Sequence, residues 1–94
     1  MPANTDPKEK LIPLRERIDE IDSRLISLFA ERMEIAEQVA KIKREYNIPI
    51  LDEERERQVV ERAAALAGEN LRAEAQKLMY IILELSRKIQ AKNT

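Results

Sequence analysis

Apolar residues recur along the first half of the chain at steps that alternate between three and four. The members of this series are Leu14, Ile18, Ile21, Leu25, Leu28, Ile35, Val39, Ile42 and Tyr46, with Leu11 extending it backward. Such a heptad seam predicts an amphipathic α-helix that packs against other helices. Because no glycine or proline interrupts residues 14–46, we predict one helix that is about 50 Å long at 1.5 Å per residue.

The N-terminal segment carries two signals that conflict. Asp6 and Pro7 resemble an N-cap followed by a proline at the first helical position. A helix starting there would hold Pro13 in its interior, where proline removes a hydrogen bond and clashes with the preceding turn. We therefore expect a kink or a short turn before the regular helix begins near Pro13. We divide the chain into a flexible tail, residues 1–10, and a helical domain, residues 11–92.

A short chain reversal separates the long helix from a second one. The segment Asn47–Pro49 predicts the end of the first helix, because proline has no amide hydrogen and disfavours the α conformation in the residue before it. Asp52 is placed as the N-cap of the next helix. We expect that helix to run from Glu53 to about Ala67 and to end at Gly68, the only glycine, in the C′ position.

The C-terminal part predicts a third helix, with Asn70 as its cap, that carries two neighbouring stripes. The first stripe is an apolar seam of Leu71, Ala75, Leu78, Ile82, Leu85 and Ile89. The second consists of Met79, Leu83, Ser86 and Gln90. Two uncharged polar groups thus extend an apolar stripe. They either face a site or mark the boundary of a fraying terminus.

Composition favours an all-α fold of three helices, one long, one short and one medium. Leu, Ile, Ala and Val dominate an apolar content of 44%, and there are one glycine and three aromatic residues. A compact chain of 94 residues has a radius of gyration of about 12 Å, so a long helix would leave much of its seam uncovered. We infer an intertwined helical-bundle homodimer.

Charge and missing residue types exclude several classes of function. The formal net charge of −1 provides no field that would gather nucleic acid or an anionic membrane. The sequence lacks both cysteine and histidine, which removes thiolate chemistry, the commonest general base and the commonest metal ligands. The N-terminus has no apolar core of a signal peptide, and no run approaches a membrane span. We expect a cytoplasmic protein.

Two cations on the long helix are the first candidate site residues. Arg32 occupies the one seam position that is not apolar, where it either fixes helix register or binds a ligand. Lys43 follows eleven residues later, which is only about 20° from three full turns, so both side chains project from one face about 16 Å apart. They would bracket one ligand.

A second group of candidates lies at the start of the second helix. Asp52, Arg55 and Glu56 fall on one face at offsets of three and four. Taken alone, each is an ordinary solvated charge beside a loop. Glu56 stands three residues before the apolar stripe that starts at Val59, however, which turns its side chain toward the core.

Arg15 lies about 100° round the helix from Arg32, so it cannot easily serve the same site from the same helix. In an antiparallel or crossed dimer, Arg15 of one chain would instead complete the pocket of the other. Together with Lys43 and Arg55, these cations would need an anion with at least two negative groups. Arginine's planar fork suits carboxylates.

The remaining candidates specify the rest of the ligand. Asp52 and Glu56 would accept a hydrogen bond from a hydroxyl, and Ser86 and Gln90 would donate neutral ones. The residues therefore predict a small hydroxylated dicarboxylate as the ligand.

These motifs, in their order and separations, resemble the all-helical chorismate mutases over residues 11–90. The matching segments are Leu14–Glu16, Ala30–Arg32, Lys41–Lys43, Asp52–Glu56 and Ser86–Gln90. The resemblance implies conversion of chorismate to prephenate by a Claisen rearrangement, on the branch that leads to phenylalanine and tyrosine. It also implies a reaction that needs no metal, nucleophile or cofactor.

The resemblance further implies a role for each candidate. Lys43 and Gln90 would donate to the ether oxygen whose bond breaks, and Lys43 would also hold a carboxylate. Arg32 and the Arg15 of the other subunit would clamp a carboxylate, assisted by Arg55. Ser86 would also help to bind carboxylate, and Asp52 and Glu56 would orient the ring hydroxyl.

Two other functions are compatible with a helical dimer of this kind. An isochorismate pyruvate lyase would use a similar cationic pocket, although the Asp52, Arg55 and Glu56 pattern resembles the mutases more closely. A non-catalytic dimerisation module would use Arg32 only to fix the helix register.

Overall fold

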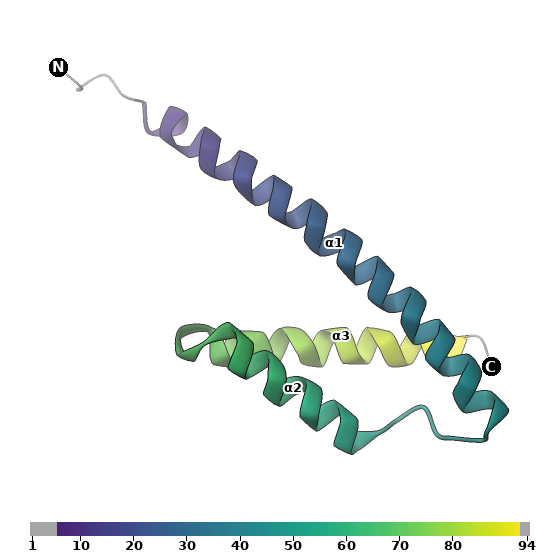
Figure 1. Cartoon of the computed structure of the whole chain (residues 1–94). Coiled ribbons are helices and arrows are strands. Elements are labelled where there is room, and N and C mark those ends of the chain that lie inside the picture. Colours follow the sequence, from purple (N-terminus) through teal and green to yellow (C-terminus); the bar gives the residue numbers. More distant parts are fainter. Residues whose placement is uncertain (1–5, 93–94) are drawn as a thin grey trace. The chain divides into compact units, whose positions relative to one another are not determined.

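The computed structural model describes residues 6–92, which are helical apart from short connections (Figure 1). The elements are α1, Pro7–Glu45; α2, Glu53–Ala67; a 3₁₀ turn η2, Glu69–Leu71; and α3, Arg72–Lys92. Within this part of the chain there is no strand, so the predicted all-α class is confirmed. The chain divides into two compact units, Met1–Arg32 and Met33–Thr94, and the second contains the end of α1, α2 and α3.

The start of α1 differs from the prediction. An oxygen of the Asp6 carboxylate accepts a hydrogen bond from the backbone N–H of Lys8 at 2.9 Å, and Pro7 is the first helical residue. Pro13 lies inside the helix, so a start near Pro13 after a short turn is wrong, and the alternative of a kink at Pro13 stays a prediction. The helix therefore starts at the cap formed by Asp6 and Pro7, even though Pro13 removes one backbone hydrogen bond from its interior. Residues 7–10 of the predicted tail are helical and residues 1–5 lie outside the described part; the boundary at residue 11 stays a prediction.

α1 ends where the sequence indicates, through a Schellman motif. Asn47 has a φ of 55°, in the left-handed region that asparagine tolerates. The N–H of Ile48 donates to the Lys43 carbonyl at 2.8 Å, and the N–H of Asn47 donates to the Arg44 carbonyl at 3.3 Å. These two bonds satisfy carbonyls that the helix end leaves unpaired, and Pro49 then prevents its continuation.

Both predicted ends of α2 are confirmed. An oxygen of the Asp52 carboxylate accepts the Arg55 N–H at 3.0 Å, so Asp52 is the N-cap. Gly68 follows the last helical residue with φ 83° and ψ 171°, a combination that is essentially restricted to glycine.

Replacing Gly68 with alanine should lower the free energy of unfolding by about 1 to 3 kcal/mol. No atom within 4 Å would meet the added Cβ, so the cost comes from the backbone conformation and not from a clash. Denaturant unfolding at a fixed protein concentration measures it. The change Glu69→Ala next to it serves as control and should stay within about 0.5 kcal/mol of the parent; equal effects would contradict the prediction.

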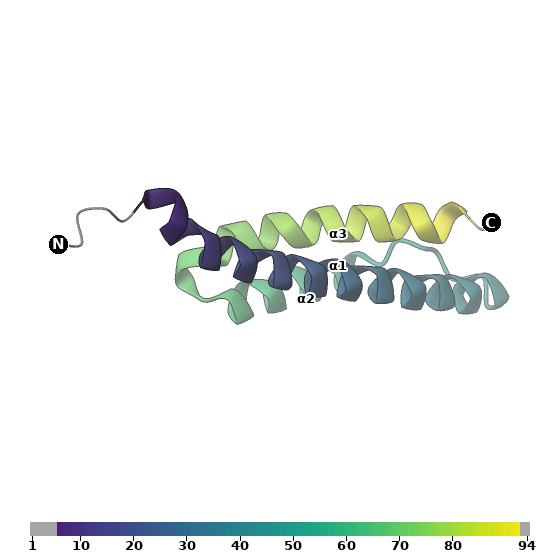
Figure 2. The same ribbon diagram turned by 90° about the horizontal axis from the view of Figure 1, so that it is seen from above.

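α2 and α3 form an antiparallel hairpin across η2, and the two helices lie side by side (Figure 2). The predicted cap Asn70 is the middle residue of η2, and α3 begins only at Arg72. Asn70 was therefore wrongly assigned as the cap. Gly68 makes the reversal instead, and its carbonyl accepts the N–H of Leu71 at 3.2 Å.

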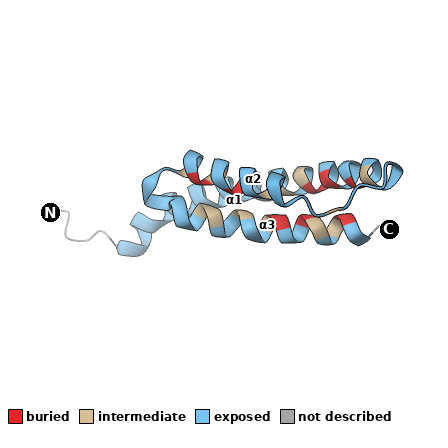
Figure 3. Cartoon of the chain, turned by 90° about the horizontal axis from the view of Figure 1, so that it is seen from below, coloured by how far each residue is buried: buried red, intermediate tan, exposed pale blue. Residues whose placement is uncertain are grey.

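The buried stripe of α1 lies one residue beyond the predicted seam, whereas that of α3 belongs to the second stripe that the sequence indicated. In α1 the buried side chains are Met33, Ala36 and Ala40, and in α3 they are Leu83, Ser86 and Gln90 (Figure 3). The predicted seam residues of α1 are exposed in the single chain, for example Leu25 at 50% and Leu28 at 62%. Among the described residues no large side chain is completely buried. A single chain therefore packs with one stripe and leaves the apolar seam uncovered.

No helix within residues 6–92 combines the length and apolar character that crossing a membrane requires.

Candidate functional site

The end of α1, the following loop and the end of α3 surround a cavity of about 490 Å³. It is lined by Ala40, Lys43, Arg44, Asn47, Ile48, Ile50 and Gln90. This volume lies within the range of small-molecule sites, which is about 300 to 1,000 Å³. The cavity brings together Lys43 and Gln90, two residues that the sequence analysis assigned to one site from opposite ends of the domain.

Lys43 is half-buried, and the loop holds its ammonium group. The Nζ atom donates a hydrogen bond to the backbone carbonyl of Ile50 at 2.7 Å. An ammonium group has three donors, so two remain for a ligand. The Schellman motif fixes the loop against the same residue through the Lys43 carbonyl. Helix end and loop thus orient one positive charge at the cavity.

Ser86 and Gln90 are buried polar residues on one face of α3, with 6% and 8% of their surface exposed. The Gln90 Nε2 donates to the Ser86 Oγ at 3.2 Å. The Gln90 Oε1 is buried without a hydrogen-bond partner. A buried amide oxygen without a donor is costly, so this side chain is arranged for a partner that the chain itself does not provide. The fraying-terminus alternative for these two positions is therefore wrong.

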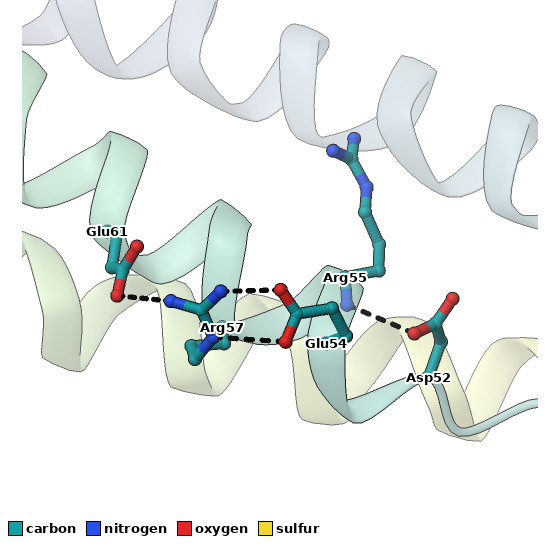
Figure 4. Close-up of polar contacts among 5 residues, drawn as sticks. All are labelled: Asp52, Glu54, Arg55, Arg57 and Glu61. Carbon is teal, nitrogen blue, oxygen red and sulfur yellow. Dashed lines mark hydrogen bonds and ion pairs between the residues drawn. The ribbon is translucent and has the colours of Figure 1, made fainter.

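Asp52 and Arg55 lie together at the start of α2, and both are exposed. Their contact is the capping bond, in which the Arg55 backbone and not its side chain takes part (Figure 4). The Arg55 guanidinium extends away from the ion pairs on the other side of α2 and makes no ion pair within the described residues. It is therefore available to an anion.

The Glu56 side chain is half-buried and faces α3, as its position before the apolar stripe predicts. Its carboxylate accepts two hydrogen bonds from the Nη1 of Arg87 on α3, at 2.5 and 2.6 Å. It lines a second cavity, of about 400 Å³, and not the cavity of Lys43 and Gln90. The sequence analysis missed Arg87. Its position directly after Ser86, beside a buried stripe, was the available signal.

A third group of charges, on the exposed face of α2, is separate from these residues. Arg57 lies between Glu54 and Glu61 and bonds to both (Figure 4). The hydrogen bond from Arg57, and then its charge, lower the pKa of the Glu54 carboxyl. The hydrogen bonds that Arg57 donates to the two carboxylates, followed by the charges of Glu54 and Glu61, raise the pKa of Arg57. Because these side chains are exposed, the network belongs to the solvated surface of the helix.

Arg15 and Arg32 belong to the first unit. Arg15 is exposed and Arg32 is half-buried. Since α1 is one helix from Pro7 to Glu45, the predicted spacing of Arg32 and Lys43 on one face follows from its geometry. That Arg15 and Arg32 join the pocket stays a prediction. In the part of the chain that the structure describes, no three acidic side chains gather where they would hold a metal ion.

The structure is thus that of an all-helical protein in which the ammonium group of Lys43 and the buried amide of Gln90 line one cavity of the size of a small molecule. The chain belongs to the chorismate mutase type II family, whose model matches residues 14–91.

Individual relatives agree with this assignment. The chain is 45% identical to a chorismate mutase of Methanocaldococcus jannaschii over 62 residues, which cover 66% of this chain and 63% of that protein. It is 39% identical to a bifunctional chorismate mutase/prephenate dehydratase of Aquifex aeolicus over 61 residues, 65% of this chain and 17% of that protein. A solved structure of a conserved hypothetical protein from Pyrococcus furiosus is similar with a TM-score of 0.73 and 40% identity, covering 92% of this chain and 99% of that one.

Proposed function

We propose that the protein is a chorismate mutase, an isomerase that converts chorismate to prephenate by a Claisen rearrangement in aromatic amino-acid biosynthesis. Family membership over residues 14–91 supports this activity. The observation that carries it is the shared cavity of Lys43 and Gln90. The reaction proceeds by electrostatic preorganisation, without a covalent intermediate or a cofactor. That the protein is cytoplasmic stays a prediction.

The chemistry requires a compact substrate and donors at one oxygen. As the ether C–O bond breaks and the new C–C bond forms, negative charge develops on the ether oxygen. Donors that are already in place stabilise that charge without reorganising during the reaction. Lys43 supplies an ammonium donor, oriented by the Ile50 carbonyl.

Gln90 supplies the second donor after a half-turn of its amide. The Ser86 hydroxyl would then donate to Oε1, and Nε2 would replace the unpartnered oxygen as the group that meets the substrate. Amide oxygen and nitrogen differ little in size, so the exchange needs no repacking. Ser86 would then orient Gln90, besides helping to bind carboxylate.

The remaining residues would hold the substrate's polar groups. Arg32, and Arg15 of a second subunit, would clamp a carboxylate, assisted by Arg55, which forms no ion pair among the described residues. Asp52 and Glu56 would accept from the ring hydroxyl. The Asp52 carboxylate uses one oxygen as a helix cap, which leaves the other free to accept.

The functional unit we propose is an intertwined homodimer. The seam of α1 is exposed along its length, from Leu14 to Tyr46. A soluble monomer rarely exposes so large a contiguous apolar surface. A second copy carries the same heptad pattern and would cover this seam. The absence of completely buried large side chains among the described residues supports this proposal.

The test is to follow chorismate absorbance with the purified protein and to identify the product. Prephenate is expected. Release of pyruvate from isochorismate would favour the lyase, and absence of both reactions would favour the dimerisation module. Binding of a bicyclic transition-state analogue separates an enzyme from a module, because a structural dimer has no reason to bind it.

The change Gln90→Glu should make activity depend on acid. A glutamine donates at any pH, whereas a carboxyl donates only when it is protonated. We expect the parent to keep its kcat/KM between pH 5 and 8. The variant should lose about tenfold per pH unit above the pKa of its new carboxyl. Gln90→Ala, which has no donor, should be slow at every pH, and a parent rate that falls steeply from pH 5 to 8 would contradict this role.

A further inference from the structure

Glu56 and Arg87 form an unusual ion pair for this chain. Among residues 6–92 it is the only ion pair that joins two helices, since the other three lie within α2 or α3. The two side chains are 24% and 36% exposed, whereas Arg57 and its partners exceed half. A pair that is partly removed from water is screened less and positions its members more firmly than an exposed one.

The geometry of the pair leaves Glu56 able to accept another hydrogen bond. One nitrogen, Nη1, approaches both carboxylate oxygens, at 2.5 and 2.6 Å. A carboxylate offers about four acceptor positions, so about two stay free. The pair therefore fixes the direction of the carboxylate without using up its capacity.

The position of Arg87 connects Glu56 to the turn of α3 that carries the proposed donors. Arg87 follows Ser86 directly, and Ser86 contacts Gln90 one turn further on. On α2, Glu56 follows the Asp52 cap by one turn and donates its N–H to the Asp52 carbonyl at 3.0 Å. Arg87 thus links the acceptor on α2, which lines the second cavity in the single chain, to the helix that carries Ser86 and Gln90.

Charge also favours this arrangement. A free Glu56 carboxylate would repel a ligand that carries two carboxylates. The guanidinium of Arg87 offsets that charge and keeps the oxygens as acceptors. Among the described residues neither Lys43, which bonds to Ile50, nor Arg57, which bonds to Glu54 and Glu61, forms an ion pair with Glu56.

We propose that Arg87 is a positioning residue that holds the Glu56 carboxylate for the ring hydroxyl of the substrate and so sets the preference for a hydroxylated dicarboxylate. The inference rests on the proposed mutase activity and adds a residue that acts only through Glu56.

The test compares kcat/KM for chorismate and for its analogue without the ring hydroxyl. Arg87→Met should lower kcat/KM for chorismate about tenfold and for the analogue less than about twofold, so the ratio of the two values should fall about five- to tenfold. Glu56→Gln should shrink it likewise, and adding Arg87→Met to Glu56→Gln should change it no further. Arg57→Met, which breaks the exposed ion pairs, should leave both values unchanged.

A purely structural ion pair would give a different result. If Arg87→Met slows both substrates by one factor, or neither, the proposal is overturned. If Arg87→Met does not fold, Arg87→Lys takes its place. Lysine carries a single point charge on a side chain of different shape. The ratio of kcat/KM for chorismate to that for the analogue should therefore lie between the ratios of the parent and of Glu56→Gln. An unchanged ratio overturns the proposal. A parent that rearranges neither compound, with no transition-state analogue bound, contradicts the proposed function itself and the inference with it.

Discussion

Replacing Lys43 with alanine should lower kcat by about a hundred- to a thousandfold, the cost of one oxyanion-type donor. In the proposed mechanism Lys43 places its positive charge at the ether oxygen, where that charge stabilises the transition state more than the substrate. The fold should survive. The side chain is only half-buried, and its one hydrogen bond goes to the carbonyl of a half-buried loop residue, Ile50.

Rates at saturating chorismate, together with circular dichroism and thermal unfolding, measure this expectation. Lys41→Ala is the matched control, because Lys41 is an exposed lysine on the same helix, two residues away. It should keep the parent rate. A Lys43→Ala enzyme with normal kcat and a raised KM would show that Lys43 only binds the substrate, and the proposed role at the ether oxygen would be wrong.

The helix ends were predictable where one residue type determines the backbone. Asp52 caps α2 and Gly68 ends it, because a carboxylate acceptor and a positive φ have few alternatives. The start of α1 was not predictable in this way. Pro7 and Pro13 are both compatible with a first helical turn, and the sequence alone does not weigh the cap at Asp6 against the lost hydrogen bond at Pro13.

The position of the core was predictable only to within one residue. A heptad pattern predicts that another helix covers the apolar stripe, but it does not indicate whether that helix belongs to the same chain or to a second one. In the single chain the small residues Ala36 and Ala40 are buried beside the seam, and the larger seam residues are exposed. Small residues allow close packing within the chain, which leaves the bulkier stripe for a partner.

The same limit applies to the candidate site. Helical period singled out Lys43 and Gln90 separately, and the resemblance to the chorismate mutases assigned both to one oxygen. The structure brings them to one cavity. The Glu56 and Arg87 pair was not predicted, since it depends on how α2 and α3 align across η2. No spacing along the chain encodes that alignment, because a 3₁₀ turn stands where Asn70 was expected to cap a helix.

The change Leu25→Glu should convert the proposed dimer into monomers and abolish activity. Leu25 lies in the middle of the exposed seam, and a twofold axis would bury it in both subunits. Removing two leucines from the interface should weaken the free energy of dimerisation by about 3 to 6 kcal/mol, and burying the two introduced charges would weaken it further. Sedimentation equilibrium measures the association, and chorismate turnover measures the activity.

Ser23→Glu provides the control, because it places the same charge about 200° round the helix from Leu25, on an exposed face. It should leave both association and activity unchanged. A parent that sediments as a monomer, or a Leu25→Glu variant that still dimerises, would show that the seam does not form the interface.

Loss of activity on dissociation has two explanations, unfolding or an incomplete pocket, and subunit mixing separates them. Arg15→Ala and Arg32→Ala should each be inactive alone as homodimers. If Arg15 serves the partner's pocket, a mixed dimer has one pocket in which both arginines are intact. Random mixing should therefore restore about one quarter of the parent activity. If Arg15 and Arg32 act within one subunit, every pocket of the mixed dimer lacks an arginine and no activity returns. Since α1 carries both residues on different faces of one continuous helix, recovery would also explain why the pocket needs the second chain.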